Sequence, residues 1–246
     1  MLITSVDNLK VAEVVKLADK KYRKSMSRYV IEGARLIADA IKNGADIVSV
    51  FVSESVAANF NYDNQIIVTD KVFAKMSDTV NSQGILAVVN KKVGCRNVAK
   101  GNCLVFDGLQ DPGNVGTLMR TAVACGFSDI YAVNCVDIYS PKVLRSAMSA
   151  HFCLNLHESN SLSEVFESLD GFEIIACDMS GESVFKRKFE NNVALVLGNE
   201  GNGLSQYSKS NADYCVSLPM ENGFESLNVA VAGSVIMYQV FSQSLK

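Results

Sequence analysis

Apolar residues in the first 90 positions alternate between helical spacing and short continuous runs. The helical spacing predicts helices over Leu9–Ala18 and Gly33–Asn43, and Gly44 ends the second of them. Runs of β-branched and other apolar residues between polar segments predict strands. The predicted strands are Ile47–Val52, Gln65–Val68 and Ile85–Val89. This pattern is typical of a small α/β domain.

The same alternation returns after residue 101, with a series of apolar runs between helical segments. Continuous apolar strands that alternate with helices indicate a parallel sheet covered on both faces, and such sheets bind ligands beyond the carboxyl ends of their strands. The predicted strands are Asn102–Phe106, Ile130–Val133, Phe152–Leu156, Glu173–Cys177, Val193–Leu197 and Tyr214–Leu218. The predicted helices are Asn114–Cys125, Pro141–Met148, Ser161–Leu169 and Ser226–Phe241.

A polar, basic and glycine-punctuated segment, Asn90–Gly101, separates the two patterns and is typical of a linker. We therefore predict two domains, residues 1–95 and residues 101–246. A chain of 246 residues is long enough for two modest domains, each with its own core.

The net charge of −3 hides an uneven distribution. Residues 1–100 hold 15 Lys and Arg against 10 Asp and Glu (+5), whereas residues 101–246 hold 8 against 16 (−8). This asymmetry favours contact between the first half and an anion such as RNA; the alternative is a solvated helix face. The candidate phosphate contacts are Lys20, Lys21, Arg23, Lys24 and Arg28.

Composition argues against metal, disulfide and membrane roles. The seven cysteines are scattered and form no C-x-x-C pair, and His151 and Cys153 fall in a predicted strand without a second ligand pair. No stretch reaches the roughly 18–20 apolar residues of a membrane span, and Met1–Lys10 lacks the apolar core of a signal peptide. We expect a cytoplasmic protein without bound metal or membrane contact.

Three polar loops follow three of the predicted strands: Asp107–Arg120, Gly198–Ser205 and Pro219–Asn228. Each loop begins where a strand ends and leads toward a helix. Because the carboxyl ends of parallel strands share one edge of the sheet, we expect the three loops to converge on one site.

The first two loops carry a cation and a carboxylate. In the first, Asn114 is a plausible N-cap, and Arg120 is a fixed cation suited to a phosphate or an oxyanion unless it is a plain surface residue. The second has the glycine order G-x-x-G-x-G, which differs from the dinucleotide fingerprint and from the P-loop and so disfavours a Rossmann oxidoreductase. Glu200 in this loop is either a turn acid or a site residue. In the third loop, Ser226 and Asn228 stand near a helix start as caps or as site residues.

Three ordered segments resemble the motifs of the SpoU (TrmH-like) family of RNA ribose 2′-O-methyltransferases in the SPOUT superfamily. The segments are Asp111-Pro-Gly-Asn-Val-Gly-Thr with Arg120-Thr-Ala, Leu197-Gly-Asn-Glu-Gly-Asn-Gly-Leu-Ser205, and Leu218-Pro-Met220 with Ser226-Leu-Asn-Val229. Ser140–Arg145 is similar to the family as well. Arg28–Leu36 resembles the start of its L30e-like substrate-binding domain.

The resemblance implies a small N-terminal L30e-like α/β domain and a C-terminal α/β domain whose parallel sheet carries a trefoil knot. It also implies a homodimer in which each site is completed across a two-fold axis. It implies S-adenosylmethionine held by Leu197, Gly198, Leu218, Met220 and Leu227. The implied activity is methylation of a ribose 2′-hydroxyl in RNA, with 23S rRNA expected; the alternatives are tRNA and a non-catalytic RNA-binding protein.

The resemblance also implies site roles for Asn114, Arg120, Glu200, Ser226 and Asn228. The family assigns a base role to the arginine at Arg120. We favour Arg120 as the cation that binds the adjacent phosphate and stabilises the developing alkoxide, with the other four holding it and the substrate in place.

The sequence departs from the family pattern at a few positions. Asn222 stands where the family often has glycine, and asparagine tolerates positive φ, so the turn is expected to survive. Ala230 replaces a frequent serine. Ala147 and Ser149 replace a common serine and glycine after Arg145.

Overall fold

The computed structural model describes residues 2–62, 64–92, 101–189, 192–222 and 226–245. The chain forms two compact units, residues 1–93 with 139–144 and residues 94–138 with 145–246. The predicted domain boundary falls on residues 95–101, most of which lie outside the described ranges, and it stays a prediction.

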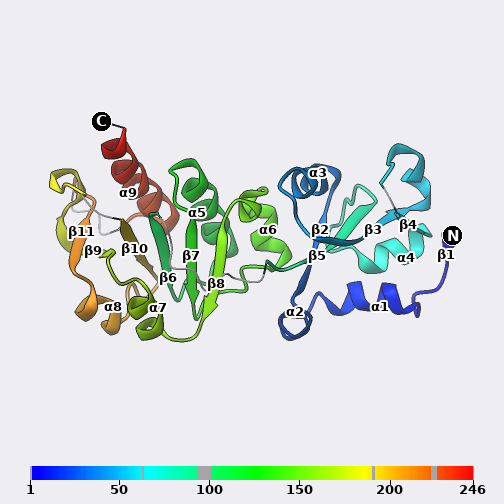
Figure 1. The fold of residues 1–246 in the computed structure, drawn as a ribbon, viewed down its shortest axis with the longest axis horizontal. Helices are drawn as coiled ribbons and strands as arrows, with labels where there is room; N and C mark the ends of the chain where they lie inside the picture. Colours follow the sequence, from blue (N-terminus) through cyan, green and yellow to red (C-terminus); the bar gives the residue numbers. More distant parts are fainter. Residues whose placement is uncertain (1, 63, 93–100, 190–191, 223–225, 246) are drawn as a thin grey trace. The chain divides into compact units, whose positions relative to one another are not determined.

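The N-terminal unit is a five-stranded mixed sheet with helices packed against it (Figure 1). Its strand order is β1-β4-β3-β5-β2; β5 is antiparallel to both of its neighbours, and the remaining pairs are parallel. The strands are β1 (Leu2–Ile3), β2 (Arg28–Glu32), β3 (Ile47–Ser53), β4 (Ile66–Val68) and β5 (Ile85–Asn90). The helices are α1 (Leu9–Lys16), α2 (Lys20–Met26), α3 (Ala34–Lys42), η1 (Glu54–Asn59) and α4 (Asp70–Met76).

The C-terminal unit is built on six parallel strands in the order β11-β9-β10-β6-β7-β8, which confirms the predicted parallel sheet. The trefoil knot stays a prediction. The strands are β6 (Cys103–Asp107), β7 (Asp129–Val133), β8 (Asn155–Ser159), β9 (Glu173–Ser183), β10 (Val193–Gly198) and β11 (Tyr214–Ser217). The helices are α5 (Pro112–Ala124), η2 (Ala150–Phe152), α7 (Leu162–Ser168), η3 (Val184–Lys186), α8 (Gln206–Asn211) and α9 (Val229–Ser244). Helix α6 (Pro141–Ala147) is divided, because its residues up to Leu144 are grouped with the N-terminal unit and the rest with this one.

Both faces of this sheet are covered, as the continuous apolar strands predicted. Successive side chains of a strand point to opposite faces. Val196 of β10 belongs to the core cluster that includes α7, whereas the next residue, Leu197, faces α5 and α9. A Cβ atom built on Gly233 of α9 would lie 2.8 Å from Leu197 and 2.7 Å from Leu118 of α5, so these two helices pack directly on the strand.

The strand predicted over Phe152–Leu156 is wrong in its first half. Residues Ala150–Phe152 form the 3₁₀ helix η2, and β8 begins at Asn155. The chain turns before η2 through two left-handed residues, Met148 (φ 43°) and Ser149 (φ 74°), and this turn precludes an extended strand there. Ser149 therefore occupies the backbone conformation that glycine adopts without strain.

No helix in the described part of the chain is both long enough and apolar enough to cross a bilayer.

Candidate functional site

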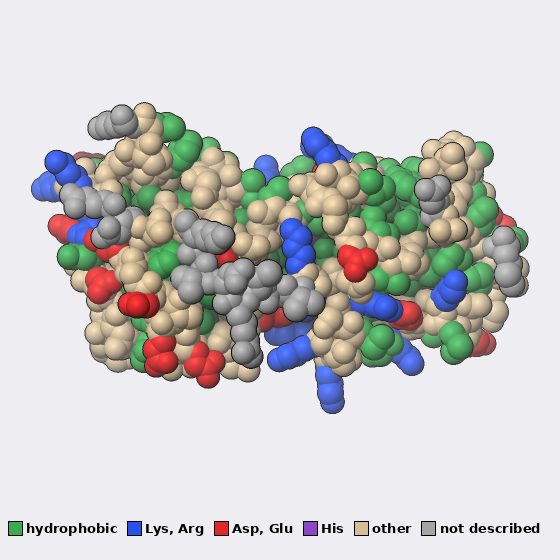
Figure 2. All heavy atoms as spheres, viewed as in Figure 1, with side chains coloured by type: hydrophobic (Ala, Val, Ile, Leu, Met, Phe, Trp, Pro, Cys, Tyr) green, Lys and Arg blue, Asp and Glu red, His purple; other side chains and the backbone are tan. Residues whose placement is uncertain are grey.

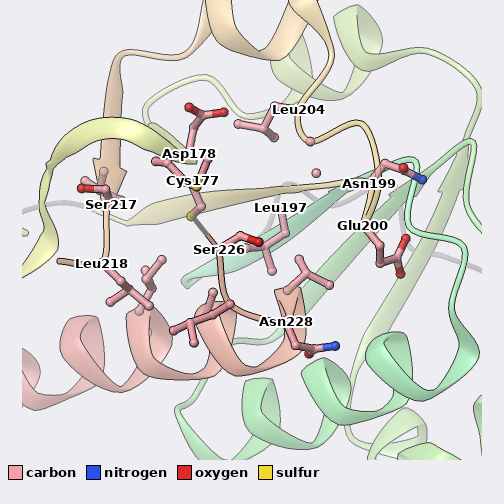
Figure 3. Close-up of a pocket in the computed structure, with 18 of the residues that line it drawn as sticks. Cys177, Asp178, Leu197, Asn199, Glu200, Leu204, Ser217, Leu218, Ser226 and Asn228 are labelled. Atoms are coloured by element: carbon pink, nitrogen blue, oxygen red, sulfur yellow. The ribbon is translucent and has the colours of Figure 1, made fainter. Parts of the chain in front are cut away.

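The loops that follow β6, β10 and β11 converge, as predicted, at the carboxyl edge of the sheet. Register brings the first two together, because Gly198 at the end of β10 pairs with Asp107 at the end of β6. Beside them lies a pocket of about 610 Å³ (Figure 3). Its lining includes all five predicted cofactor residues, namely Leu197, Gly198, Leu218, Met220 and Leu227, together with Glu200, Ser226 and Asn228.

Gly198 is required where the β10 loop folds back on itself. A Cβ atom there would lie 2.4 Å from the carbonyl carbon of Gly203 and from the nitrogen of Leu204, both of which are backbone atoms. The turn is closed by two backbone hydrogen bonds of 2.9 Å between Asn199 and Gly203. The pocket wall therefore depends on a residue without a side chain at position 198.

Asn199 shapes this loop, although the sequence analysis did not single it out. Its Oδ1 accepts hydrogen bonds from the backbone N–H groups of Gly201 and Asn202, both at 3.0 Å. Its Nδ2 donates to the carbonyl oxygen of Gly108 at 2.8 Å, which ties the β10 loop to the β6 loop. Asn199 is thus a structural link between two of the three motifs.

The carboxylate of Glu200 holds the start of α5 through hydrogen bonds. It accepts hydrogen bonds from the backbone N–H of Gln110 (3.1 Å), the backbone N–H of Asp111 (3.0 Å) and the side chain Nδ2 of Asn114 (3.1 Å). Burial acts to raise the pKa of the Glu200 carboxyl, but these hydrogen bonds and one from its own backbone outweigh it, so the pKa lies below its ordinary value. Glu200 is therefore an ionised anchor for the helix and a poor proton acceptor.

The network continues from Asn114 to α9. Asn228 Nδ2 donates to Asn114 Oδ1 at 3.0 Å, and Asn228 Oδ1 caps α9 by accepting from the N–H groups of Ala230 (2.9 Å) and Val231 (3.3 Å). A carboxylate can only accept and a helix start can only donate, so the orientation of both amides is fixed from the two ends. Asn228 is therefore the cap of α9 and also lines the pocket, and its role in the site stays a prediction.

The structure corrects one detail of the first loop and places Arg120. The N-cap of α5 is Asp111, whose side chain accepts from the N–H of Asn114, so Asn114 lies inside the first turn and its side chain is free to reach Glu200. Arg120 lies in the third turn, past the helix start. Six residues at 100° each point it about 120° away from Asn114. It is exposed, is not among the pocket-lining residues, and forms no hydrogen bond or ion pair with any described residue.

Some of the predicted phosphate contacts are exposed, and others are engaged in contacts within the protein. Lys20, Lys21 and Lys24 are exposed on α2, over which basic side chains gather in Figure 2. The prediction is wrong for Arg23, which is buried and donates to the carbonyl oxygen of Leu17 at 2.5 Å, because a guanidinium used inside the core cannot reach a phosphate. Arg28 is partly buried and forms an ion pair with Glu13 at 2.5 Å.

Besides the three loops, a fourth segment lines the pocket, and the sequence did not indicate it. Cys177, Asp178 and Met179 of β9 line it, and so does Lys209 of α8. Lys209 Nζ lies 2.8 Å from Asp178 Oδ2. The apolar run of this strand predicted its first half correctly, but no motif marks the residues that follow it.

The pocket and its rim combine apolar walls, a backbone turn and fixed polar groups. Its volume is that of sites for nucleotide-sized molecules. Leu197, Leu218, Leu227 and Ile236 supply apolar surface, and the glycine turn at Gly198 brings backbone polar atoms to the edge. Such a site can hold a nucleoside-like molecule through the backbone.

The chain is similar to known proteins over most of its length. The SpoU rRNA Methylase family matches residues 101–238, and the MRM3-like substrate binding domain matches residues 8–87. An uncharacterized tRNA/rRNA methyltransferase of Synechocystis sp. is 31% identical over 98% of this chain and 93% of its own length. The 23S rRNA (guanosine(2553)-2′-O)-methyltransferase RlmP of Bacillus subtilis is 29% identical over 97% and 98%.

Solved structures show the same fold. The AdoMet-bound rRNA methyltransferase of Sinorhizobium meliloti superposes with a TM-score of 0.87 at 25% identity, covering 100% of this chain and 99% of that one. The three motif loops, the two matched domains and the fold agree, and the chain belongs to the SpoU rRNA methylase family.

Proposed function

We propose that this protein is an S-adenosylmethionine-dependent enzyme that methylates a ribose 2′-hydroxyl in 23S rRNA. The observation that carries the proposal is the hydrogen-bond network from Glu200 through Asn114 to Asn228, which joins all three family motifs at one pocket. The named relatives supply the substrate class: RlmP of Bacillus subtilis acts on 23S rRNA. We place the enzyme in the cytoplasm.

The residues present fit the cofactor. Leu197, Leu218 and Leu227 offer apolar surface to an adenosyl group, and the space that a Cβ atom of Gly198 would fill is taken by the backbone of the loop's own turn. When bound, S-adenosylmethionine supplies a methyl group attached to a sulfonium sulfur, and the rest of the cofactor is released as a neutral thioether. The enzyme must therefore align the 2′-oxygen and let its proton leave.

Arg120 is the residue that acts on the RNA in this proposal. Its guanidinium stays charged at neutral pH and has a planar fork that matches a phosphate. It holds the phosphate next to the target ribose and stabilises the negative charge that develops on the 2′-oxygen. The proton passes to that phosphate or to water, since the carboxylate of Glu200 is already engaged by three donors at and just before the start of α5.

A methyl-transfer assay tests the proposed function. Purified protein is incubated with S-adenosylmethionine labelled in the methyl group and with separated rRNA and tRNA from a strain that lacks its gene. We expect label in 23S rRNA as a 2′-O-methylnucleotide. Label in tRNA alone would identify the tRNA alternative, and RNA binding without transfer would identify a non-catalytic binding protein.

Replacing Asn228 by Asp separates the capping role from the network. Asp caps helices as well as Asn, so α9 should remain capped. The variant has no donor for Asn114 Oδ1, and a flipped Asn114 would turn its oxygen toward Glu200, so one repulsive contact remains in either arrangement. We expect turnover to fall about tenfold or more, since an unsatisfied polar group costs about 1–3 kcal/mol, with little change in melting temperature.

The matched control is Asn8→Asp, the same change at the N-cap of α1, where Asn8 accepts from the N–H of Lys10. It should leave turnover and melting temperature unchanged. Full activity of Asn228→Asp would show that Asn228 serves α9 alone.

The N-terminal domain binds RNA through the exposed lysines of α2. The support is the +5 balance of residues 1–100 and the exposure of Lys20, Lys21 and Lys24. Each phosphate contact contributes about 0.7–0.9 to the slope of log affinity against log salt, so replacing the three by Ala should flatten that slope by about 2. The control is the triple replacement of Lys42, Lys71 and Lys75, which are exposed elsewhere in the same domain. An equal effect of both triples would contradict a localised RNA surface.

The apolar surface of α9 supports a homodimer. Val231, Val235 and Tyr238 lie along one side of this helix and are 51%, 38% and 52% exposed. A two-fold interface buries the same patch on both subunits. A two-fold axis here explains why Arg120 lies outside the pocket lining of its own chain, because it completes the pocket of the partner.

Mixing two inactive variants tests this shared site. The Arg120→Ala variant lacks the cation, and the Gly198→Ala variant has a disrupted cofactor-binding loop. In a mixed dimer, the intact arginine of one chain meets the intact pocket of the other, so random subunit exchange should restore about a quarter of wild-type activity. No activity in any mixture, with dimer exchange verified by mass spectrometry, would show that each chain uses its own Arg120.

A further inference from the structure

Strand β9 leaves its pairing with β11 at the edge of the pocket. Ala176 pairs with Cys215, but the next residue of β11, Val216, pairs with Glu182, so residues 177–181 form an excursion that is skipped in the strand pairing with β11. The excursion closes tightly at Gly181, where a Cβ atom would lie 2.5 Å from the backbone of Cys215 and Val216. Ser217 Oγ also donates to the carbonyl oxygen of Gly181 at 2.8 Å. The excursion is therefore a well-packed part of the pocket wall.

Asp178 is the ionisable residue of this excursion, and it lines the pocket (Figure 3). Its Oδ1 accepts from the backbone N–H of Ser180 at 3.1 Å and from Ser180 Oγ at 2.7 Å, and its Oδ2 accepts from Lys209 Nζ at 2.8 Å. A carboxylate offers about four acceptor positions. Within the described part of the chain, one position of Asp178 is left for a bound molecule.

The neighbours of Asp178 keep it charged. The hydrogen bond from Lys209 and those from the backbone and side chain of Ser180 lower the pKa of its carboxyl to about 2. At neutral pH the group is an acceptor only. The pair with Lys209 does little for stability, because the lysine side chain is 44% exposed and solvent-exposed ion pairs contribute little.

We propose that Asp178 is a cofactor-binding residue whose carboxylate accepts a hydrogen bond from a donor of S-adenosylmethionine, an inference that rests on the proposed function. The cofactor has two kinds of strong donor, the ribose hydroxyls of its nucleoside and the ammonium of its methionine tail. Among the described residues that line the pocket, the other carboxylate is Glu200, which is engaged with the start of α5. Asp178 therefore supplies the ionic acceptor that the apolar walls lack.

Binding calorimetry on the full chain tests this assignment without relying on turnover. The ligands are S-adenosylhomocysteine, which has nucleoside and tail, and methylthioadenosine, which has the nucleoside without the amino-acid tail. The variants are Asp178→Asn and, as a matched control, Glu182→Gln. Glu182 is a carboxylate on the same strand, paired with Arg187 and outside the pocket lining.

We expect Asp178→Asn to bind S-adenosylhomocysteine about tenfold more weakly or worse, since a hydrogen bond to a charged group is lost, whereas Glu182→Gln stays within about threefold of wild type. An equal loss for methylthioadenosine would assign the donor to the nucleoside, and an unchanged affinity for it would assign the donor to the ammonium. Both results support the proposal.

Two results would overturn it. The first is wild-type affinity of Asp178→Asn for S-adenosylhomocysteine. The second is an equal loss in Glu182→Gln, because that variant changes a carboxylate of the same strand that does not line the pocket. Failure of the wild-type protein to bind S-adenosylhomocysteine would be a different outcome, since it would overturn the proposed function as well.

Discussion

Replacement of Arg120 by Ala should lower methyl transfer by two or more orders of magnitude and leave cofactor binding nearly unchanged. The reason for the first effect is the loss of a fixed positive charge at the developing alkoxide, a loss that costs about 3–4 kcal/mol in comparable oxyanion sites. The reason for the second is that Arg120 acts on the RNA and not on the cofactor in the proposed mechanism, and it is exposed in the third turn of α5, outside the pocket lining of its own chain. Single-turnover methyl transfer and calorimetry with S-adenosylhomocysteine measure the two effects separately.

Arg120→Lys distinguishes a charged clamp from a base. Lysine keeps a charge but lacks the planar fork that binds a phosphate at two points, so we expect little rescue. Lysine also has a neutral form that is reached at about pH 10. A rate of Arg120→Lys that climbs toward wild type as the pH approaches that value would contradict the electrostatic role and support proton removal by this side chain.

Gly198→Ala should abolish cofactor binding and lower the stability of the C-terminal domain. The added Cβ atom would meet backbone atoms of Gly203 and Leu204 at 2.4 Å, and backbone cannot move aside as a flexible side chain can. The turn closed by Asn199 and Gly203 must then open, and with it the wall of the pocket. Overpacking of this kind costs about 1–3 kcal/mol or more, which thermal unfolding would detect alongside the lost calorimetric signal.

The same loop offers a matched control in Gly201→Ala. At Gly201 the nearest atom to an added Cβ is Asn199 Oδ1 at 3.6 Å, which is an ordinary contact. This variant should bind S-adenosylhomocysteine as the wild type does. If both alanine variants lose binding equally, the loop requires general flexibility rather than the close approach at Gly198.

The sequence predicted the site better than the details of its geometry. The apolar runs gave β6 and β10 to within one residue, and three polar loops beyond such runs had to meet at one edge of a parallel sheet. The positive φ of Asn222 (59°) confirms the turn expected where the family often has glycine. The cap of α5 was misassigned to Asn114, because Asp111 and Asn114 are both good caps and only the position of Glu200 decides between them.

Two of the helices that were not predicted, α2 and α8, share a physical cause. Helix α2 buries Arg23, and α8 buries Ser208, whose hydroxyl donates to Asp107 at 2.7 Å. Analysis of hydrophobic periodicity counts such residues as solvent-facing, so neither segment showed an apolar stripe. The excursion of β9 was missed for a similar reason: its tightness rests on a contact between Gly181 and the backbone of β11, which no local pattern encodes.

The pairing of β6 with β10 has a consequence for synthesis on the ribosome. Gln110 and Glu200 are 90 residues apart, so the segment that leads into α5 leaves the ribosome long before the carboxylate that accepts its hydrogen bond. Until β10 is made, β6 and β9 each expose an unpaired edge at what becomes the centre of the sheet. The N-terminal domain can fold during translation, whereas the C-terminal sheet must wait for almost the whole chain, and nascent chains paused before residue 193 are the ones that chaperones must protect from aggregation.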